Sequence, residues 1–163
     1  MSALILVFSV VAVIAIIFIV IFSIIKSKSN NVVFYDNSVV NSNNNFGRKL
    51  NILLIDDNDL NNKVTTRILN EYNVSVDVVT VFEDGLSKIN SGIKYDLVLL
   101  DYLIPMHDAR DMLNSIKRIN SNLSVVALST VNNKDEVMYL GFNDFLLKPI
   151  NDSEVERILN NIK

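Results

Sequence analysis

Two adjacent carboxylates follow directly on an apolar run in the middle of the sequence. Residues 53–62 read LLIDDNDLNN, so the run leads straight into Asp56 and Asp57, and a third acid follows at Asp59. Carboxylates this close raise each other's proton affinity and resist removal from water. A chain that keeps such a pair at the end of a buried strand therefore either exposes it to water or uses it to hold a cation.

Three later apolar runs also end in polar residues. DLVLL (96–100) precedes Asp101, SVVAL (124–128) precedes Ser129 and Thr130, and DFLL (144–147) precedes Lys148 and Pro149. In an open α/β sheet the carboxyl ends of parallel strands meet at one edge, and ligands bind there. Each residue alone has an ordinary explanation, such as a turn cap for an Asp. Together, carboxylates, a hydroxyl and an ammonium at one edge indicate a site.

The candidate strands of that sheet are five short apolar runs. They are NILLI (51–55), VSVDVVTVF (74–82), DLVLL (96–100), SVVAL (124–128) and DFLL (144–147). Several are continuously apolar, which is typical of parallel strands covered by helices on both faces. The runs therefore predict strands that are buried on both sides.

Helical periodicity separates these runs. The expected helix faces are Leu60, Val64, Ile68 and Tyr72; Met112, Ile116 and Ile119; and Val155, Ile158, Leu159 and Ile162. Ser153 and Glu156 form a capping-box signature at the start of the last helix. Five β-α repeats within residues 50–163 predict an α/β protein, a doubly wound sandwich with a parallel sheet and right-handed crossovers.

The amino-terminal segment has a different composition. Residues 3–25 contain no charged residue, no Pro and no Gly. As a helix the segment spans roughly 34 Å, enough to cross a hydrocarbon core of ~30 Å. A cleavable signal peptide is the alternative, but the segment lacks a basic start, a short apolar core and an A-x-A-like site. We therefore expect a transmembrane helix within residues 1–25.

Lys26 and Lys28 follow this span directly, whereas Met1 and Ser2 carry no side-chain charge. The positive-inside rule then places the carboxyl-terminal part in the cytoplasm, as the domain of a single-pass cell-membrane protein. The absence of cysteine agrees with a reducing compartment. Residues 26–49 are rich in Asn and Ser and are expected to be a linker, with VVFY (32–35) as a patch that could dock on the domain or the membrane.

Charge excludes one class of function. Residues 50–163 hold 11 Lys and Arg against 17 Asp and Glu, because four of the 15 basic residues and one of the 18 acidic residues precede Leu50. The resulting net charge of −6 argues against a nucleic-acid-binding surface.

The motifs LLIDDN, LVLLDYLIPMHDA, VVALST and GFNDFLLKPI, in this order and spacing, resemble the receiver domain of two-component response regulators. The resemblance covers residues 50–163 and is strongest to receivers fused to hybrid histidine kinases. It implies a flavodoxin-like sheet of five parallel strands in the order 2-1-3-4-5. It also implies a phosphoryl group passed from a sensor histidine kinase or a histidine phosphotransfer protein.

The resemblance also implies a role for each residue of the predicted edge. Asp101 is the expected phosphoacceptor. Asp56, Asp57, Asp101 and the backbone carbonyl of Leu103 are the expected Mg²⁺ ligands. Ser129 and Lys148 contact the phosphoryl oxygens, and Ser129 with Phe145 forms the switch, in which the Phe145 ring moves from an exposed to a buried position.

Mg²⁺ is also expected on physical grounds, because a phosphoryl donor approaching three carboxylates is repelled unless a cation cancels their charge. Because the sequence ends at Lys163, after the last expected helix, we expect a stand-alone receiver. Its output is then contact with a downstream protein that the sequence does not name. We expect no enzymatic activity beyond Mg²⁺-dependent self-phosphorylation and self-dephosphorylation.

Two other functions are compatible with parts of the pattern. Asp57 and Asp59 form a D-x-D similar to that of haloacid-dehalogenase-like phosphatases, but this reading leaves Asp101 without a role. A degenerate receiver that only binds proteins is the other alternative, and the intact acid, hydroxyl and lysine set argues against it. His107, the only histidine, is expected to be a solvated loop residue.

Overall fold

The computed structural model describes residues 48–162 of the 163-residue chain. Strands and helices alternate throughout this part. They are β1 (Leu50–Ile55), α2 (Asp59–Leu69), β2 (Val74–Val79), α3 (Phe82–Asn90), β3 (Leu97–Asp101), α4 (Ala109–Ile119), β4 (Ser124–Ser129), α5 (Lys134–Leu140), β5 (Asp144–Leu147) and α6 (Asp152–Asn160).

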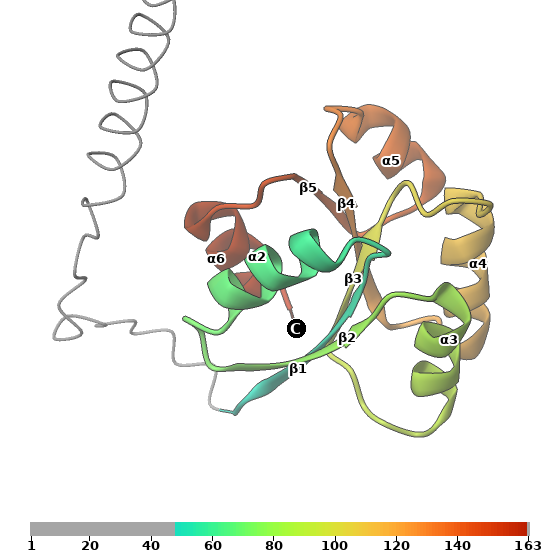
Figure 1. Ribbon diagram of the computed structural model, residues 1–163. Helices are drawn as coiled ribbons and strands as arrows, with labels where there is room; N and C mark the ends of the chain where they lie inside the picture. The colour runs from blue at the N-terminus through green and yellow to red at the C-terminus, as the bar shows by residue number, and fades with distance from the viewer. Residues whose placement is uncertain (1–47, 163) are drawn as a thin grey trace, which may run out of the picture. The chain divides into compact units, whose positions relative to one another are not determined.

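The strands form one parallel sheet in the order β2-β1-β3-β4-β5, which confirms the predicted order. Figure 1 shows the sheet between two layers of helices, with α2 and α6 on one face and α3, α4 and α5 on the other. β1, β3 and β4 lie inside the sheet, and their apolar residues are buried. The continuous apolar runs of the sequence are explained by this burial on both faces.

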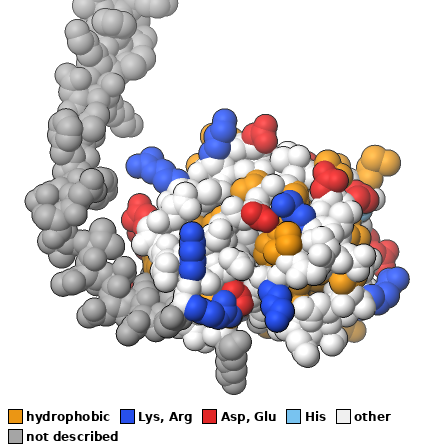
Figure 2. Space-filling model, turned by 90° about the horizontal axis from the view of Figure 1, so that it is seen from below, with side chains coloured by type: hydrophobic (Ala, Val, Ile, Leu, Met, Phe, Trp, Pro, Cys, Tyr) orange, Lys and Arg blue, Asp and Glu red, His pale blue; other side chains and the backbone are white. Residues whose placement is uncertain are grey.

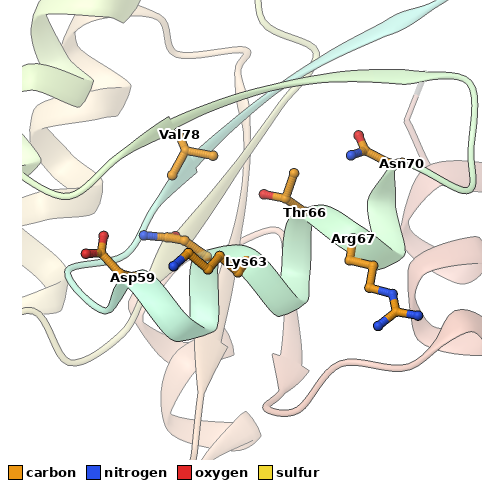
Figure 3. Close-up of a pocket in the computed structure, with 7 residues that line it drawn as sticks. Asp59, Lys63, Thr66, Arg67, Asn70 and Val78 are labelled. Atoms are coloured by element: carbon orange, nitrogen blue, oxygen red, sulfur yellow. The ribbon is translucent and has the colours of Figure 1, made fainter.

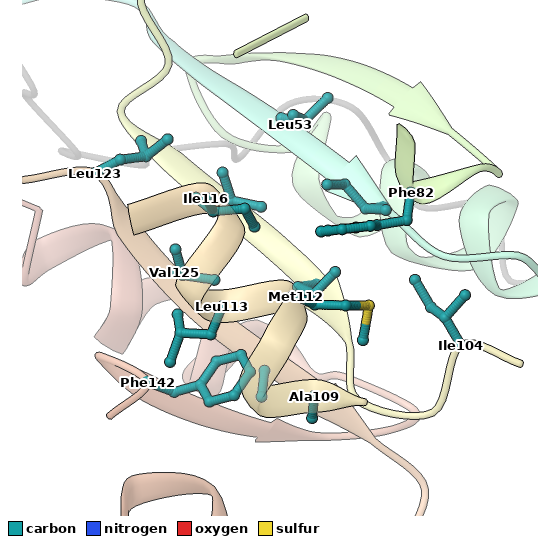
Figure 4. Close-up of a cluster of buried hydrophobic side chains, with 14 of the residues drawn as sticks. Leu53, Phe82, Ile104, Ala109, Met112, Leu113, Ile116, Leu123, Val125 and Phe142 are labelled. Carbon is teal, nitrogen blue, oxygen red and sulfur yellow. The ribbon is translucent and has the colours of Figure 1, made fainter. Parts of the chain in front are cut away.

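Alternation along the strands divides the interior into two hydrophobic cores. Leu53 and Ile55 of β1 pack toward α3, α4 and α5, whereas Ile52 and Leu54 pack toward α2 and α6. Figure 4 shows the first core, in which Met112, Leu113 and Ile116 of α4 lie against the sheet together with Phe82 and Phe142. Each helix on this side buries one stripe, as an amphipathic helix does.

Two of the predicted boundaries were wrong by a few residues. The second strand ends at Val79, and Phe82 opens α3 instead of ending β2. At the start of α6 the cap is Asn151, whose side chain accepts from the backbone N–H of Glu154 and donates to the carboxylate of the same residue. The reciprocal cap was thus predicted two residues too late.

The expected inward face of α2 was also wrong. The helix buries Asn62, Thr65 and Leu69, whereas Leu60 is 70% exposed and Val64 is 42% exposed. A hydrogen bond fixes this rotation, because Asn62 Nδ2 donates to the backbone carbonyl of Asp56 at 2.8 Å. Leu60 and Val64 of the expected face therefore lie on the surface, whereas Ile68 and Tyr72 are partly buried against the core.

The predicted transmembrane helix (1–25) and nearly all of the linker (26–49) lie outside the described residues. Among residues 48–162, no helix combines the length and the apolar character needed to cross a bilayer.

Close packing of α3 on β1 gives the first testable prediction. A Cβ at Gly85 would lie 2.5 Å from Cδ1 and 3.2 Å from Cγ1 of Ile55, a fully buried side chain. We expect Gly85→Val to lower the free energy of unfolding by about 1–3 kcal/mol, measured by urea denaturation.

Ser87→Val is the matched control, because it places the same side chain on the exposed side of the same helix. It should change stability by a few tenths of a kcal/mol only. Equal effects of the two substitutions would show that helix propensity, and not the contact with Ile55, limits this position.

Candidate functional site

The carboxyl ends of β1, β3, β4 and β5 bring the predicted polar residues together at one edge of the sheet. Asp56 follows β1, Asp101 and Ser129 end β3 and β4, and Lys148 follows β5. Carboxylate oxygens of Asp56, Asp57 and Asp101 all lie within 4.8 Å of one another. Residues up to 92 positions apart in the sequence thus form one cluster.

Lys148 is the cation of this cluster. Its ammonium lies 2.6 Å from Oδ2 of Asp56 and 2.9 Å from Oδ2 of Asp101. The Lys148 side chain is only 8% exposed, and those of Asp56 and Asp101 are similarly buried. Buried charges are tolerated when each has an opposite partner, and here one ammonium serves two carboxylates.

The loop after β1 holds Asp56 in a fixed orientation. Its Oδ1 accepts a hydrogen bond from the backbone N–H of Asn58 at 2.9 Å. Asn58 is also the N-cap of α2, since its side chain accepts from the backbone N–H groups of Leu60 and Asn61. Sequence reasoning assigned Asn58 no role, although Asn before a helix is a common capping signal.

Asp57 differs from its neighbour because it is exposed at the mouth of the cluster. Within the described residues its carboxylate makes no hydrogen bond or ion pair. The cluster therefore carries three carboxylates against one ammonium, and the carboxylate without a partner faces solvent. An all-oxygen, net negative, partly open site has the chemistry that Mg²⁺ prefers, so the residues fit this ion.

The loop that follows Asp101 holds the Asp101 carboxylate in place. Its Oδ1 accepts the backbone N–H of Leu103 at 3.1 Å, while its Oδ2 faces Lys148. The hydrogen bond fixes the backbone of Leu103 beside the cluster. That the Leu103 carbonyl is a metal ligand stays a prediction.

Ser129 lies at this edge but its hydroxyl is engaged elsewhere. Its Oγ donates to the carbonyl of Val131 at 3.0 Å and accepts the N–H of the same residue at 3.1 Å. Its backbone carbonyl accepts the N–H of Lys148 at 2.7 Å. Contact between the Ser129 hydroxyl and a phosphoryl group on Asp101 therefore requires these local hydrogen bonds to break.

Phe145 differs from the expectation for the switch. The ring is 6% exposed and belongs to the core beneath α3, α4 and α5. In this structure it already occupies a buried position, so the exposed starting point of the predicted movement is not present. The cause is strand alternation, because Phe145 faces the same covered side as its neighbour Ala127 on β4.

Tyr102 links the loop after Asp101 to a different element. Its hydroxyl donates to Oε1 of Glu136 on α5 at 2.8 Å. Burial, together with this carboxylate, raises the pKa of Tyr102 to about 12. The residue next to the expected phosphoacceptor is thereby tied to α5, a connection between distant residues that strand-end patterns do not reveal.

His107 lies in the same loop, against α3. Its ring centroid is 5.3 Å from that of Phe82, and its Nε2 is 3.6 Å from a carboxylate oxygen of Glu83. The side chain is partly covered, so the solvated loop position that we expected is only partly correct. Asp59, the second acid of the D-x-D reading, lies in the first turn of α2 and is not part of the carboxylate cluster.

Known proteins resemble this chain over the same region. The family model for the response regulator receiver domain matches residues 52–160. Two-component response regulator 24 of Arabidopsis thaliana is 29% identical over 117 residues, which cover 70% of this chain and 84% of that protein. Hybrid signal transduction histidine kinase L of Dictyostelium discoideum is 30% identical over 118 residues, 66% of this chain but only 7% of that protein.

Transcription factor SKN7 of Candida albicans is 32% identical over 117 residues, which cover 69% of this chain but only 20% of that protein. Among solved structures, the receiver domain of the sensor histidine kinase PA1611 of Pseudomonas aeruginosa has a magnesium ion coordinated in its active-site cleft. It is similar with a TM-score of 0.62 and 25% identity, over 70% of this chain and 97% of that one.

A receiver domain from Methylobacillus flagellatus has a TM-score of 0.63 at 23% identity, over 71% of this chain and 99% of that one. The fold of these structures is the fold described above, and the family match spans all four strand ends that carry the carboxylates, the hydroxyl and the lysine. The chain belongs to the response regulator receiver domain family.

Proposed function

We propose that this chain is a membrane-anchored receiver that accepts a phosphoryl group on Asp101 from a sensor histidine kinase or a histidine phosphotransfer protein. The observation that carries the proposal is the ion pairing of Lys148 with both Asp56 and Asp101, beside an Asp57 carboxylate that has no partner among the described residues. The similarity to receivers of hybrid histidine kinases supports this kind of partner.

The chemistry follows from the positions of these groups. A carboxylate oxygen of Asp101 attacks the phosphorus of a phosphohistidine, and no general base is needed because a carboxylate is itself a nucleophile. The P–N bond breaks, and the imidazole nitrogen keeps its electron pair. Mg²⁺, when bound by Asp56, Asp57, Asp101 and the Leu103 carbonyl, supplies positive charge against the repulsion between the carboxylates and the phosphoryl group.

Lys148 and Ser129 stabilise the product, the phosphoryl group on Asp101. The Lys148 ammonium already lies beside Asp101 and is in place to donate to a phosphoryl oxygen. Ser129 donates to another phosphoryl oxygen once its hydroxyl leaves the carbonyl of Val131. The loss of that turn is a local change that phosphorylation produces, and it links the site to the loop before α5.

Phosphorylation is the direct test. With Mg²⁺ and acetyl phosphate, the full-length protein in detergent should gain one phosphoryl group that is labile to base, measured by mass spectrometry. Asp101→Asn should abolish the gain because the nucleophile is lost, and chelation of Mg²⁺ should do the same. Asp57→Asn should raise the Mg²⁺ concentration for half-maximal labelling roughly tenfold or more.

Asp59→Asn is the matched control, because it removes a neighbouring acid that lies outside the cluster. It should label like the unaltered protein. Labelling of the Asp101→Asn protein to the same extent would refute the assignment of the phosphoacceptor. An unaltered protein that never labels would support the degenerate receiver.

The surface beside the site suits a protein donor. Leu60 and Val64 on α2 lie exposed next to Lys148, Pro149 and Ile150, around a mainly apolar hollow of about 250 Å³. A donor protein whose phosphohistidine reaches Asp101 would contact the surface around this hollow. Exposed apolar side chains at such a position are typical of a protein contact, and we assign this surface to the phosphodonor protein.

The donor surface gives a selective prediction. Leu60→Asp should lower the rate of transfer from a phosphorylated histidine phosphotransfer protein at least tenfold, because a charge would replace an apolar contact. Labelling by acetyl phosphate should stay unchanged, since this small donor needs no protein contact. Tyr139→Asp, at an exposed position of α5, is the control. Equal loss with both donors would mean that the substitution damages the site itself.

The downstream partner is proposed to be a protein. The net charge of residues 50–163 is −6, with 11 basic against 17 acidic residues. On the face shown in Figure 2, basic side chains are interspersed with acidic ones and do not form a broad basic patch. A surface of this kind does not favour nucleic acid.

Membrane anchoring rests on the sequence of residues 3–25 and on Lys26 and Lys28. We expect the protein to stay in the membrane fraction after an alkaline carbonate wash. A tag after Lys163 should be digested by protease only when the cytoplasmic side is accessible. Release by carbonate would refute the span, and digestion from the outer side of intact cells would reverse the orientation.

A further inference from the structure

The two edges of the sheet differ in how they are protected from pairing with another strand. β5, at one edge, has four residues and is followed by Lys148 and Pro149. β2, at the other edge, has six residues, of which four are valine, and it contains neither Pro nor Lys. Short strands, prolines and lysines are the usual features that protect an edge. β2 therefore lacks the protection that β5 has.

The helix next to β2 does not cover this edge. A groove of about 510 Å³ lies between α2 and β2, with Thr66, Asn70 and Val78 among the residues that line it. Figure 3 shows Thr66 on α2 and Val78 on β2 directed toward each other across the groove. Val78 is 39% exposed. The groove thus leaves room for a further strand beside β2.

The free backbone groups of this edge belong to alternate residues. The N–H of Asp56 donates to the carbonyl of Val79 at 3.2 Å, so the backbone of Val79 faces β1. Because orientation alternates along a strand, Val76 and Val78 direct their N–H and C=O groups away from β1. The described sheet offers these groups no partner, since β2 pairs only with β1. A strand that pairs with β2 must use them.

The other face of β2 carries two complementary side chains. Hydrogen bonds from Tyr95 and Lys88 hold the pKa of the Asp77 carboxyl below its usual range, so this group is charged. Both bonds go to Oδ2, and Oδ1 has no partner among residues 48–162. The hydroxyl of Ser75 also forms no hydrogen bond within that range. Ser75 and Asp77 line the same hollow, and therefore lie on one face of the strand.

We propose that two copies of this chain associate through β2, with the two β2 strands antiparallel and Val76 opposite Val76 of the second copy. The two five-stranded sheets then continue into one another across a two-fold axis. Val78 of each copy lies opposite Val74 of the other copy. This contact covers the exposed side chain of Val78 and occupies the free backbone groups of the edge.

Charge selects this register. Antiparallel pairing joins residues of like backbone orientation, so only two registers pair all but one of the six strand residues, one centred on Val76 and one on Asp77. The register centred on Asp77 places two carboxylates directly opposite each other, which is destabilising. The register centred on Val76 places Asp77 opposite Ser75 of the second copy. The Ser75 hydroxyl can then donate to the free Oδ1, once on each side of the axis.

A single cysteine tests the register, because the natural chain contains none. In the purified full-length protein, Val76→Cys should form a disulfide between two copies at least tenfold faster than Val78→Cys. Opposed Cα atoms of a hydrogen-bonded pair are about 5.5 Å apart, which suits a disulfide, whereas the two Val78 residues are separated by about 13 Å along the strands. Val78 is more exposed than Val76, so random collisions would favour the control.

Charge provides the second readout. In the Val76→Cys protein, Ser75→Asp should slow the formation of the disulfide severalfold, because it places a carboxylate opposite Asp77, whereas Ser75→Lys should not slow it. Ser87→Asp and Ser87→Lys, on the exposed side of α3, make the same changes in net charge and should leave the rate unchanged.

Three results would overturn the proposal. The first is a Val78→Cys protein that forms the disulfide as fast as the Val76→Cys protein. The second is the absence of a disulfide between copies in both proteins. The third is an equal effect of the aspartate substitutions at Ser75 and Ser87, because the charge would then act on collisions in general and not on the strand pair.

Discussion

The buried contact of one ammonium with two carboxylates is the constraint on which the arrangement depends. Lys148 follows β5, whereas its partners Asp56 and Asp101 belong to β1 and β3. The three residues meet only if the strands are parallel and in register. In addition, β1 must lie beside β3, and only β4 may lie between β3 and β5. Removing one partner of a buried ion pair costs about 3–5 kcal/mol in proteins generally, so fold and site stabilise each other.

The strands and the site edge could be predicted because both are encoded locally. Central strands such as Leu97–Asp101 are buried on both faces and read as continuous apolar runs, and the residue after each run falls at the same edge. The rotation of α2 could not be predicted, since a polar residue, Asn62, faces the sheet. Its amide donates a hydrogen bond to the Asp56 carbonyl, and Leu60 and Val64 are left exposed on the other side of the helix.

The residues that sequence reasoning missed act through contacts between distant elements or through loop geometry. Tyr102 reaches Glu136 across 34 positions, and no periodicity indicates such a pair. The buried position of Phe145 depends on the helices that cover its face of the sheet. By contrast, the N-cap role of Asn58 was accessible from sequence, because it stands between an acidic strand end and a helix.

The division of the interior by the sheet has a consequence for how this protein can change. The buried side chains under α2 and α6 and those under α3, α4 and α5 form separate clusters, which meet only through the sheet backbone. Substitutions far apart and without shared neighbours add nearly independently in stability. The two helical layers can therefore accumulate mutations separately, so that recognition of one partner is free to diverge while the opposite surface is conserved.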